Sequence, residues 1–162
     1  MKSFIRTARL HARFAAPLLG GRRLLLPLAA PIFLAALSAC NSNLELSSVG
    51  DTMAYDKTLL EAKPGQSVKL TFHNVANSPA MLHDWVLVKP GTIEAVANAG
   101  IAAGPGKDYI PDSPDILAHT RLTKPGETDS IEFKAPDTPG DYPYICTYPG
   151  HFALMKGILR VQ

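Results

Sequence analysis

Two segments of alternating hydrophobicity, each introduced by a Pro-Gly turn, constrain the fold of this chain more than its other features. In residues 67–72 and 128–133 apolar side chains alternate with polar ones, which is typical of a strand with one buried face. Each segment follows a Lys-Pro-Gly turn, at residues 63–65 and 124–126. In such a turn proline presets φ and glycine supplies the positive φ of a type II turn. Short strands separated by turns predict an all-β sandwich or barrel with Greek-key connections.

Three further segments fit the same architecture. Residues 85–88 form a continuous apolar run of the kind found in a buried strand. A turn at residues 136–141, rich in Pro, Gly and Asp, leads into a strand over 142–146, and residues 156–161 make the last strand. One region departs from the β pattern. Residues 92–101 are rich in alanine and predict a short helix that Gly-Pro-Gly at 104–106 ends, so 91–115 is interpreted as a connecting excursion outside the sandwich.

The first 39 residues predict a secretion signal rather than part of the domain. They carry six basic residues and no acidic ones, followed by an apolar run over residues 24–39 that two prolines interrupt. This charged-then-apolar layout is typical of a signal peptide. The run is too short and too interrupted for a membrane span, which needs about 20 apolar residues.

The signal ends in Leu-Ser-Ala-Cys at residues 37–40, which resembles the lipobox of bacterial lipoproteins. The resemblance implies that Cys40 becomes the mature N-terminus and carries lipid. Residues 40–43 are then a lipidated cysteine with a short tether, and residues 44–162 form the folded domain. The protein is expected to be exported and lipid-anchored to a bacterial membrane, facing the periplasm or the cell surface.

Removing the predicted signal peptide changes the net charge of the chain from positive to negative. Six of the 16 Lys and Arg residues lie in it, which leaves 10 basic against 14 acidic residues and a net charge of −4. A mildly acidic domain is not expected to bind nucleic acid, which requires a basic stripe.

Four side chains form the candidate metal site: Cys146, His151 and Met155 near the C-terminus, and His83 some sixty residues earlier. Two imidazoles, one thiolate and a weak axial thioether are the ligand set that suits a mononuclear copper redox centre. In the turn at residues 147–150, proline stiffens the backbone and glycine permits the tight turn. The resulting loop can direct Cys146 and His151 toward one point.

Two other interpretations of these residues remain open. Cys146 could act as a nucleophile with His151 or His83 as its base, but the sequence offers no orienting third group, so an enzyme is not expected. Zinc also accepts Cys and His, but it has no use for a thioether, so Met155 argues for copper. With Cys40 lipidated, Cys146 is the only thiol, and a bound metal would protect it in an oxidising compartment.

The run over residues 146–157 resembles the copper loop of azurins, members of the cupredoxin family, with four residues between Cys146 and His151 and three between His151 and Met155. Residues 83–87 resemble the family's first-ligand segment, and 107–122 its middle region. The resemblance covers nearly all of residues 44–162, and lipid-anchored azurins are the nearest type. It implies an eight-stranded Greek-key sandwich and one type 1 copper per chain.

The same resemblance implies one-electron transfer, with copper cycling between Cu(I) and Cu(II) for redox proteins of the cell envelope such as c-type cytochromes or copper-containing reductases. The alternative is copper storage or delivery without redox turnover. The ring edge of His151 is expected to reach solvent through an apolar docking patch whose candidate members are Met81, Pro149, Phe152 and Ala153. The other two histidines of this region, His73 and His119, are expected to be structural or surface residues, and in azurins a His at the place of His73 lies near the site without binding it.

Three positions depart from the azurin pattern. Leu82 stands where azurins have a glycine whose carbonyl oxygen lies opposite the Met, so the resemblance implies that Leu82 offers its backbone carbonyl there. Asp84 replaces the asparagine that ties the ligand loop to the strand, and a carboxylate beside copper is expected to favour Cu(II) and lower the reduction potential. Asp84 and Tyr148 are expected to lie next to the ligands. The cysteines of the azurin disulfide are absent.

Overall fold

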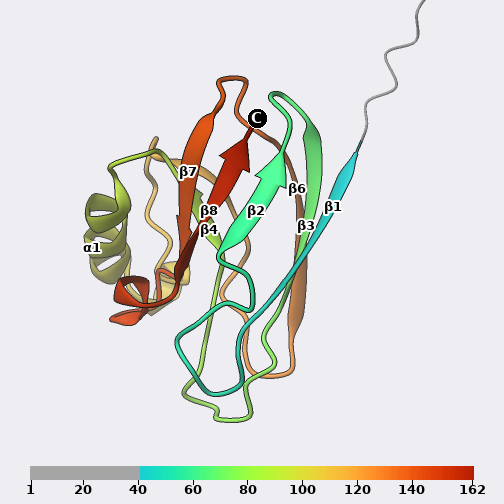
Figure 1. Cartoon of the computed structure of the whole chain (residues 1–162). Coiled ribbons are helices and arrows are strands. Elements are labelled where there is room, and N and C mark those ends of the chain that lie inside the picture. Colours follow the sequence, from blue (N-terminus) through green and yellow to red (C-terminus); the bar gives the residue numbers. More distant parts are fainter. Residues whose placement is uncertain (1–40) are drawn as a thin grey trace, which may run out of the picture. The chain divides into compact units, whose positions relative to one another are not determined.

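A computed structural model describes residues 41–162, and its helix and strands are labelled in Figure 1. The elements are β1 (Ser42–Ser47), β2 (Leu59–Ala62), β3 (Ser67–His73), β4 (Val86–Val88), α1 (Ile93–Ala103), β5 (Ile116–His119), β6 (Thr128–Lys134), β7 (Gly140–Ile145) and β8 (Lys156–Val161). Two short 3-10 helices lie at Pro105–Lys107 and His151–Ala153. Among the described residues no helix has the length and apolar character needed to cross a membrane.

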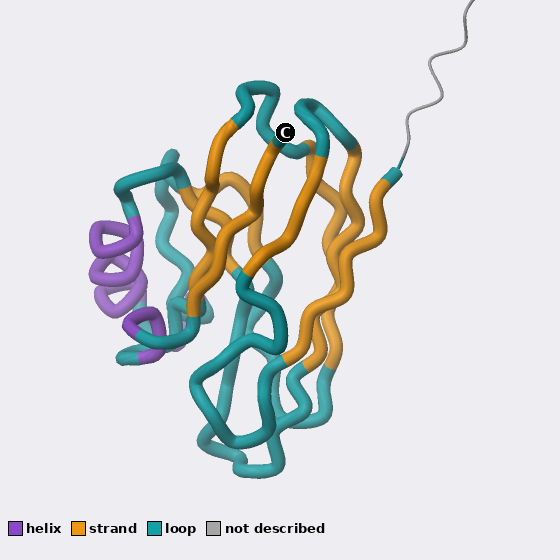
Figure 2. The backbone as a smooth tube through the Cα atoms, viewed as in Figure 1, coloured by secondary structure: helices purple, strands orange, loops and turns teal. Residues whose placement is uncertain are grey.

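The strands form two sheets, one of order β1-β3-β6 and one of order β2-β8-β7-β4-β5. Sequence neighbours are mostly not sheet neighbours: β1 runs parallel to β3, and β2 runs parallel to β8. Figure 2 shows the strands of both sheets running along the length of the domain, with loops gathered at its two ends. The all-β sandwich with Greek-key-type connections that the sequence predicts is therefore confirmed.

The core lies between the two sheets and is apolar. Fully buried side chains come from both layers, Leu70 and Phe72 of β3 on one side and Leu87 and Leu159 on the other. Trp85 lies among them, with its ring centroid 5.5 Å from that of Phe133 and 5.8 Å from that of Tyr144. Burial of one such side chain stabilises a fold by about 1.5–3 kcal/mol, so this layer holds the sandwich together without a disulfide.

The two Lys-Pro-Gly turns are present as the sequence predicts. Gly65 has φ of 66° and Gly126 has φ of 78°, the left-handed region that the turn requires. The amide of Gln66 donates to the carbonyl of Lys63 at 3.1 Å, and the amide of Glu127 donates to the carbonyl of Lys124 at 2.9 Å. Each turn leads directly into the strand that follows it.

The excursion contains the expected helix. α1 ends at Ala103, two residues beyond the predicted end, and Gly104 donates its amide to the carbonyl of Gly100. Val96 and Ala97 of α1 pack against Val86 and Ile145 of β4 and β7, which buries part of the outer face of the larger sheet. In Figure 1 the helix lies beside the loop between β7 and β8.

Strands β1, β2 and β5 have no clear counterpart in the sequence pattern. β1 begins at Ser42, two residues before the domain boundary that the sequence indicates, because Ser42 pairs in parallel with Val68 and extends the sheet. A stretch of Asn and Ser has no strand signature of its own, and only its partner strand makes it one. The signal peptide predicted over residues 1–39, and Cys40, lie outside the described residues.

Candidate metal centre

Three potential ligand atoms from two distant parts of the chain converge on one point. Nδ1 of His83 lies 3.2 Å from Nδ1 of His151 and 3.9 Å from Sγ of Cys146, and the last two atoms are 3.6 Å apart. His83 and Cys146 are fully buried, and His151 is 6% exposed. Three donors in a plane around one ion, at bond lengths of about 2.0–2.3 Å, lie roughly 3.5–4 Å from one another. The residues present therefore fit one bound metal ion.

The loop between β7 and β8 is closed by its own backbone. The amide of His151 donates to the carbonyl of Tyr148 at 3.0 Å, and the amide of Met155 donates to the carbonyl of His151 at 2.8 Å. The amide of Cys146 in turn donates to the carbonyl of Met155 at 3.1 Å. Gly150 has φ of 84°, which confirms that the turn needs its glycine. Met155 is fully buried in the core cluster that contains Cys146.

His83 is fixed through its backbone by Thr123. The two residues form an isolated antiparallel bridge, in which the amide of His83 donates to the carbonyl of Thr123 at 3.1 Å and the amide of Thr123 donates back at 2.8 Å. The hydroxyl of Thr123 also donates to the carbonyl of His83 at 2.6 Å. Leu82, directly before His83, is half-buried. The first-ligand segment is thus held to the rest of the domain by backbone and hydroxyl hydrogen bonds.

Asp84 ties the ligand loop to this segment. One carboxylate oxygen accepts the amide N–H of Thr147 at 2.7 Å, and the other accepts the hydroxyl of the same residue. Both partners are donors, so a carboxylate makes this tie without needing an N–H of its own. Complete burial raises the pKa of Asp84 to about 6, although the hydrogen bonds from Thr147 act in the opposite direction. The hydroxyl of Tyr55 donates to the backbone carbonyl of Asp84 at 2.6 Å.

The protonation states of the three ligands suit a cation. Burial, and secondarily the charge of His151, lowers the pKa of His83 to about 4, and burial lowers the pKa of His151 as well. Both imidazoles are therefore neutral near pH 7 and can each offer a lone pair. Burial raises the pKa of the Cys146 thiol, and the carboxylate of Asp84 adds to the effect. A thiolate at this place requires a bound cation, which displaces the thiol proton.

Tyr148 lies against the candidate ligand His151, as expected. Their ring centroids are 4.7 Å apart, and the ring of Tyr109 meets that of Tyr148 edge-on at 5.3 Å. Tyr109 comes from the excursion and has φ of 57°, following Asp108 with φ of 53°. Left-handed backbone costs free energy at non-glycine residues, and such strain gathers at functional sites. Nothing in the sequence points to Tyr109 as a neighbour of the site, because its contact with Tyr148 exists only in the folded domain.

The four residues expected to form an apolar patch at His151 are all at least partly accessible to solvent. Of the expected patch residues, Ala153 is exposed and the other three, Met81, Pro149 and Phe152, are half-buried. Phe152 also packs against the small cluster under α1, so it supports the loop as well as the surface. Leu154 is 67% exposed, and the sequence analysis missed it because an apolar residue in a loop gives no sign of its exposure.

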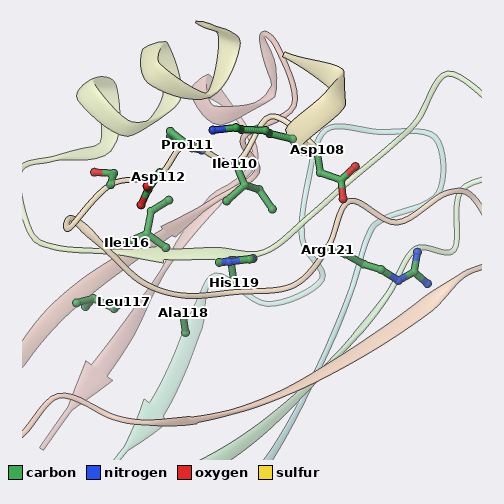
Figure 3. A pocket seen from close by; sticks show the side chains of 11 residues that line it. Asp108, Ile110, Pro111, Asp112, Ile116, Leu117, Ala118, His119 and Arg121 are labelled. Carbon is green, nitrogen blue, oxygen red and sulfur yellow. The ribbon is translucent and has the colours of Figure 1, made fainter. Parts of the chain in front are cut away.

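The two remaining histidines lie outside the ligand cluster, as expected. His73 lies between β1 and β6, with Nδ1 2.9 Å from the hydroxyl of Thr128 and Nε2 2.9 Å from a carboxylate oxygen of Glu45. His119 belongs to β5 and lines a surface pocket of about 580 Å³ between that strand and the excursion. Figure 3 shows its ring on the floor of the pocket, below Ile110.

Comparison with known proteins agrees with this site. Residues 42–162 match the family model of copper-binding proteins of the plastocyanin/azurin family. The chain is 46% identical over 122 residues to auracyanin-A of Chloroflexus aurantiacus, covering 74% of each chain. It is 37% identical over 117 residues to azurin-1 of Alcaligenes xylosoxydans xylosoxydans, covering 68% of this chain and 91% of that one.

The chain also resembles solved structures of auracyanins. The structure of auracyanin A, described as a blue copper protein, superposes with a TM-score of 0.69 at 43% identity and covers 75% of this chain and 99% of that one. The dithionite-reduced auracyanin of Roseiflexus castenholzii gives a TM-score of 0.69 at 38% identity, covering 75% and 97%. This domain therefore corresponds to almost the whole of those two solved chains. The fold, the His-Cys-His cluster and the family match agree on a single type 1 copper, and the chain belongs to the plastocyanin/azurin family of copper-binding proteins.

Proposed function

We propose that this protein is a one-electron carrier that holds its copper with His83, Cys146, His151 and Met155, and with the backbone carbonyl of Leu82. The convergence of three buried ligand atoms, one of them a thiol, carries the proposal. Bound copper supplies the one-electron redox couple. No orienting third group for a nucleophilic Cys146 has come to light among the described residues, so we propose a carrier and not an enzyme.

The protein's part is to hold the ligands still. Cu(I) and Cu(II) prefer different geometries, and a site that does not move between them needs little reorganisation. The Thr123 hydroxyl donates to the carbonyl of His83, and the Thr147 amide donates to the carboxylate of Asp84, and these bonds fix both ligand segments to the sandwich. The backbone bonds between Cys146, Met155 and His151 fix the loop internally. The ligands therefore keep their places without depending on the ion.

Electrons are proposed to pass through the ring edge of His151 and the apolar surface around it. This surface is small, which suits a carrier, because electron-transfer encounters are weak and bury less than about 1,200 Å². Exposed Leu154 extends the apolar area that a partner can cover. Partners of the proposed class are c-type cytochromes or copper-containing reductases of the cell envelope.

We further propose that Cys40 carries the lipid that anchors the protein to a bacterial membrane, on the periplasmic side or the cell surface. β1 begins at Ser42 and runs parallel to β3, whose far end leads to the first-ligand segment. The start of β1 thus lies roughly 17 Å from the metal end along the strand. In Figure 1 the start of β1 and the C-terminus share the end away from the β7–β8 loop. An anchor so close to β1 leaves the metal end free for partners.

Metabolic labelling with a radioactive fatty acid tests the anchor. The full chain is expected to incorporate label and to fractionate with membranes, and a Cys40→Ser variant is expected to do neither. Equal labelling of both proteins would contradict the lipid anchor without affecting the copper assignment.

Titration of residues 41–162 with Cu(II) tests the carrier. The expected result is an intense thiolate-to-copper absorption band at one ion per chain that a reductant bleaches and an oxidant restores. Copper bound without reversible bleaching would favour storage or delivery instead. A thiol that still reacts with an alkylating reagent after metal loading would favour an enzyme. Absence of any band would end the proposal.

A further inference from the structure

Asn74 lies directly after β3 and is 1% exposed, although neither the ligand set nor the sequence pattern points to it. Its side chain makes hydrogen bonds to four different parts of the chain. The two N–H groups donate to the carbonyls of Met81 at 2.8 Å and Thr123 at 3.0 Å. The oxygen accepts the hydroxyl of Ser48 at 3.3 Å and the amide of Ala76 at 3.1 Å. All four positions of the amide are filled, so its orientation is fixed.

The two donors of Asn74 act on both sides of Leu82. The carbonyl of Met81 belongs to the peptide bond that leads into Leu82, so the amide holds that peptide directly. The carbonyl of Thr123 accepts both from Asn74 and from the amide of His83, the residue after Leu82. One side chain thus fixes the backbone immediately before and, through Thr123, immediately after Leu82.

The backbone of Asn74 keeps this side chain in place. Its amide donates to the carbonyl of Glu127 at 3.0 Å, and its carbonyl accepts the amide of Gly126 at 2.8 Å. These bonds connect it to the Pro-Gly turn that precedes β6. The hydroxyl of Ser48, which donates to the Asn74 side chain, also accepts the amide of Val75 at 2.9 Å, so Ser48 connects to both the side chain of Asn74 and the next residue.

We propose that Asn74 is a positioning residue for the metal centre, which sets the place of the Leu82 backbone and of the His83 ligand through its two N–H donors. The inference rests on the proposed role of His83 as a ligand. A side chain that accepts but does not donate leaves the carbonyl of Met81 without this donor and the carbonyl of Thr123 with the amide of His83 alone, and the loss of a donor to a buried carbonyl is unfavourable. The segment is then expected to move to regain partners, and the ligand moves with it.

An Asn74→Asp variant of residues 41–162 tests the inference, because aspartate has the same shape but loses both donors. Groups that orient metal ligands typically contribute 10- to 100-fold to metal affinity. We expect the variant to bind copper at least about 10-fold more weakly than the wild type and to change the ratio of its charge-transfer bands. The measurements are a competition titration with a chelator and the absorption and electron paramagnetic resonance spectra.

Ser48→Ala is the matched control. It removes a buried hydroxyl that bonds to the same amide, but it leaves both donors of Asn74 in place. It is expected to lower the midpoint of thermal unfolding while copper affinity and spectra stay as in the wild type. If Asn74 were only structural, the two variants would behave alike, both less stable and both with an unchanged metal site, and that result would overturn the inference.

Asn74→Ala keeps the test decisive if Asn74→Asp does not fold. It removes both donors to the carbonyls of Met81 and Thr123 without placing a carboxylate in the buried site. Weaker copper binding and a changed spectrum in this variant support positioning by the two donors, and affinity and spectrum as in the wild type contradict it. A wild-type protein that gives no copper band at all refutes the proposed function instead, so the two failures are distinguishable.

Discussion

Replacing Cys146 with serine is expected to abolish the intense absorption band of the copper-loaded protein. The band requires charge transfer from a thiolate, and a serine hydroxyl at the same place is neither soft nor ionised. Serine is nearly isosteric and Cys146 is fully buried within an ordered loop, so the fold is expected to survive. Absorption spectroscopy during Cu(II) titration, with circular dichroism to confirm folding, checks the prediction. An undiminished band in the folded variant would mean that Cys146 is not the ligand.

Met155→Leu is the matched comparison within the same loop. Both residues are fully buried and joined by the hydrogen bond from the Cys146 amide to the Met155 carbonyl, which either substitution keeps. Because we propose Met155 as a weak axial ligand, the leucine variant is expected to keep an intense thiolate band and to change its reduction potential. Loss of the band in both variants would indicate that the loop, rather than the thiolate, had been disrupted.

Replacing Asp84 with asparagine is expected to raise the reduction potential. The buried carboxylate stabilises Cu(II) more than Cu(I) when it is ionised, and asparagine removes that charge. For unit charges roughly 6 Å apart at an effective dielectric constant near 20, Coulomb's law gives about 3 kcal/mol. For one electron this corresponds to a shift on the order of 100 mV, measured by voltammetry at pH 8. A potential that does not rise contradicts the prediction.

Thr147→Val is the control for the charge. It removes the hydroxyl that donates to Asp84 but keeps the carboxylate, so its potential is not expected to rise. Asparagine at position 84 can still accept the amide of Thr147 and donate to its hydroxyl. A rise in both variants would attribute the shift to an altered contact between residues 84 and 147 rather than to the lost charge.

Asp84→Asn is also expected to give a pH-dependent difference in the stability of the metal-free protein. The pKa of Asp84 is raised to about 6 from an ordinary value of 3.8, so the folded protein holds this proton more tightly than the unfolded chain. That contribution is fully present below about pH 4 and is lost as the pH rises through 6. The free energy of unfolding of Asp84→Asn, relative to wild type, is therefore expected to increase by about 3 kcal/mol across this range. Urea unfolding at several pH values measures it, and a constant difference contradicts it.

Local signals in the sequence predicted the parts of the fold that depend on local chemistry. The Pro-Gly turns at residues 63–66 and 124–127, strands β3, β6 and β8, and helix α1 follow from turn residues, alternation and composition. β1 and β2 were not predicted, because each is stabilised as a strand by hydrogen bonds to its parallel neighbour. Pairing between distant segments leaves little signal in a short stretch of sequence.

For the candidate ligands, too, the residues that lie close together in the sequence were predictable from it and the distant one was not. Cys146, His151 and Met155 were identifiable because all three ligand types stand on one short run, and ligand chemistry with close spacing is a local pattern. His83 was anonymous by spacing and was found by its resemblance to a family segment. In the structure, Nδ1 of His83 lies beside Nδ1 of His151 in the loop.

The sequence by itself determined the class of fold, the metal and the three candidate ligands of the loop, because these depend on residue type and on short spacings along the chain, whereas His83 was found by its resemblance to a family segment. Only the tertiary structure decided what holds the ligands. Asn74 lies nine residues from His83, and Thr123 and Tyr109 lie further along the chain, so their contacts exist only after the sandwich has closed. A buried amide or hydroxyl looks like any other polar residue in a sequence. Its role follows from the groups that folding brings within hydrogen-bond distance, and those are set by the packing of the whole domain.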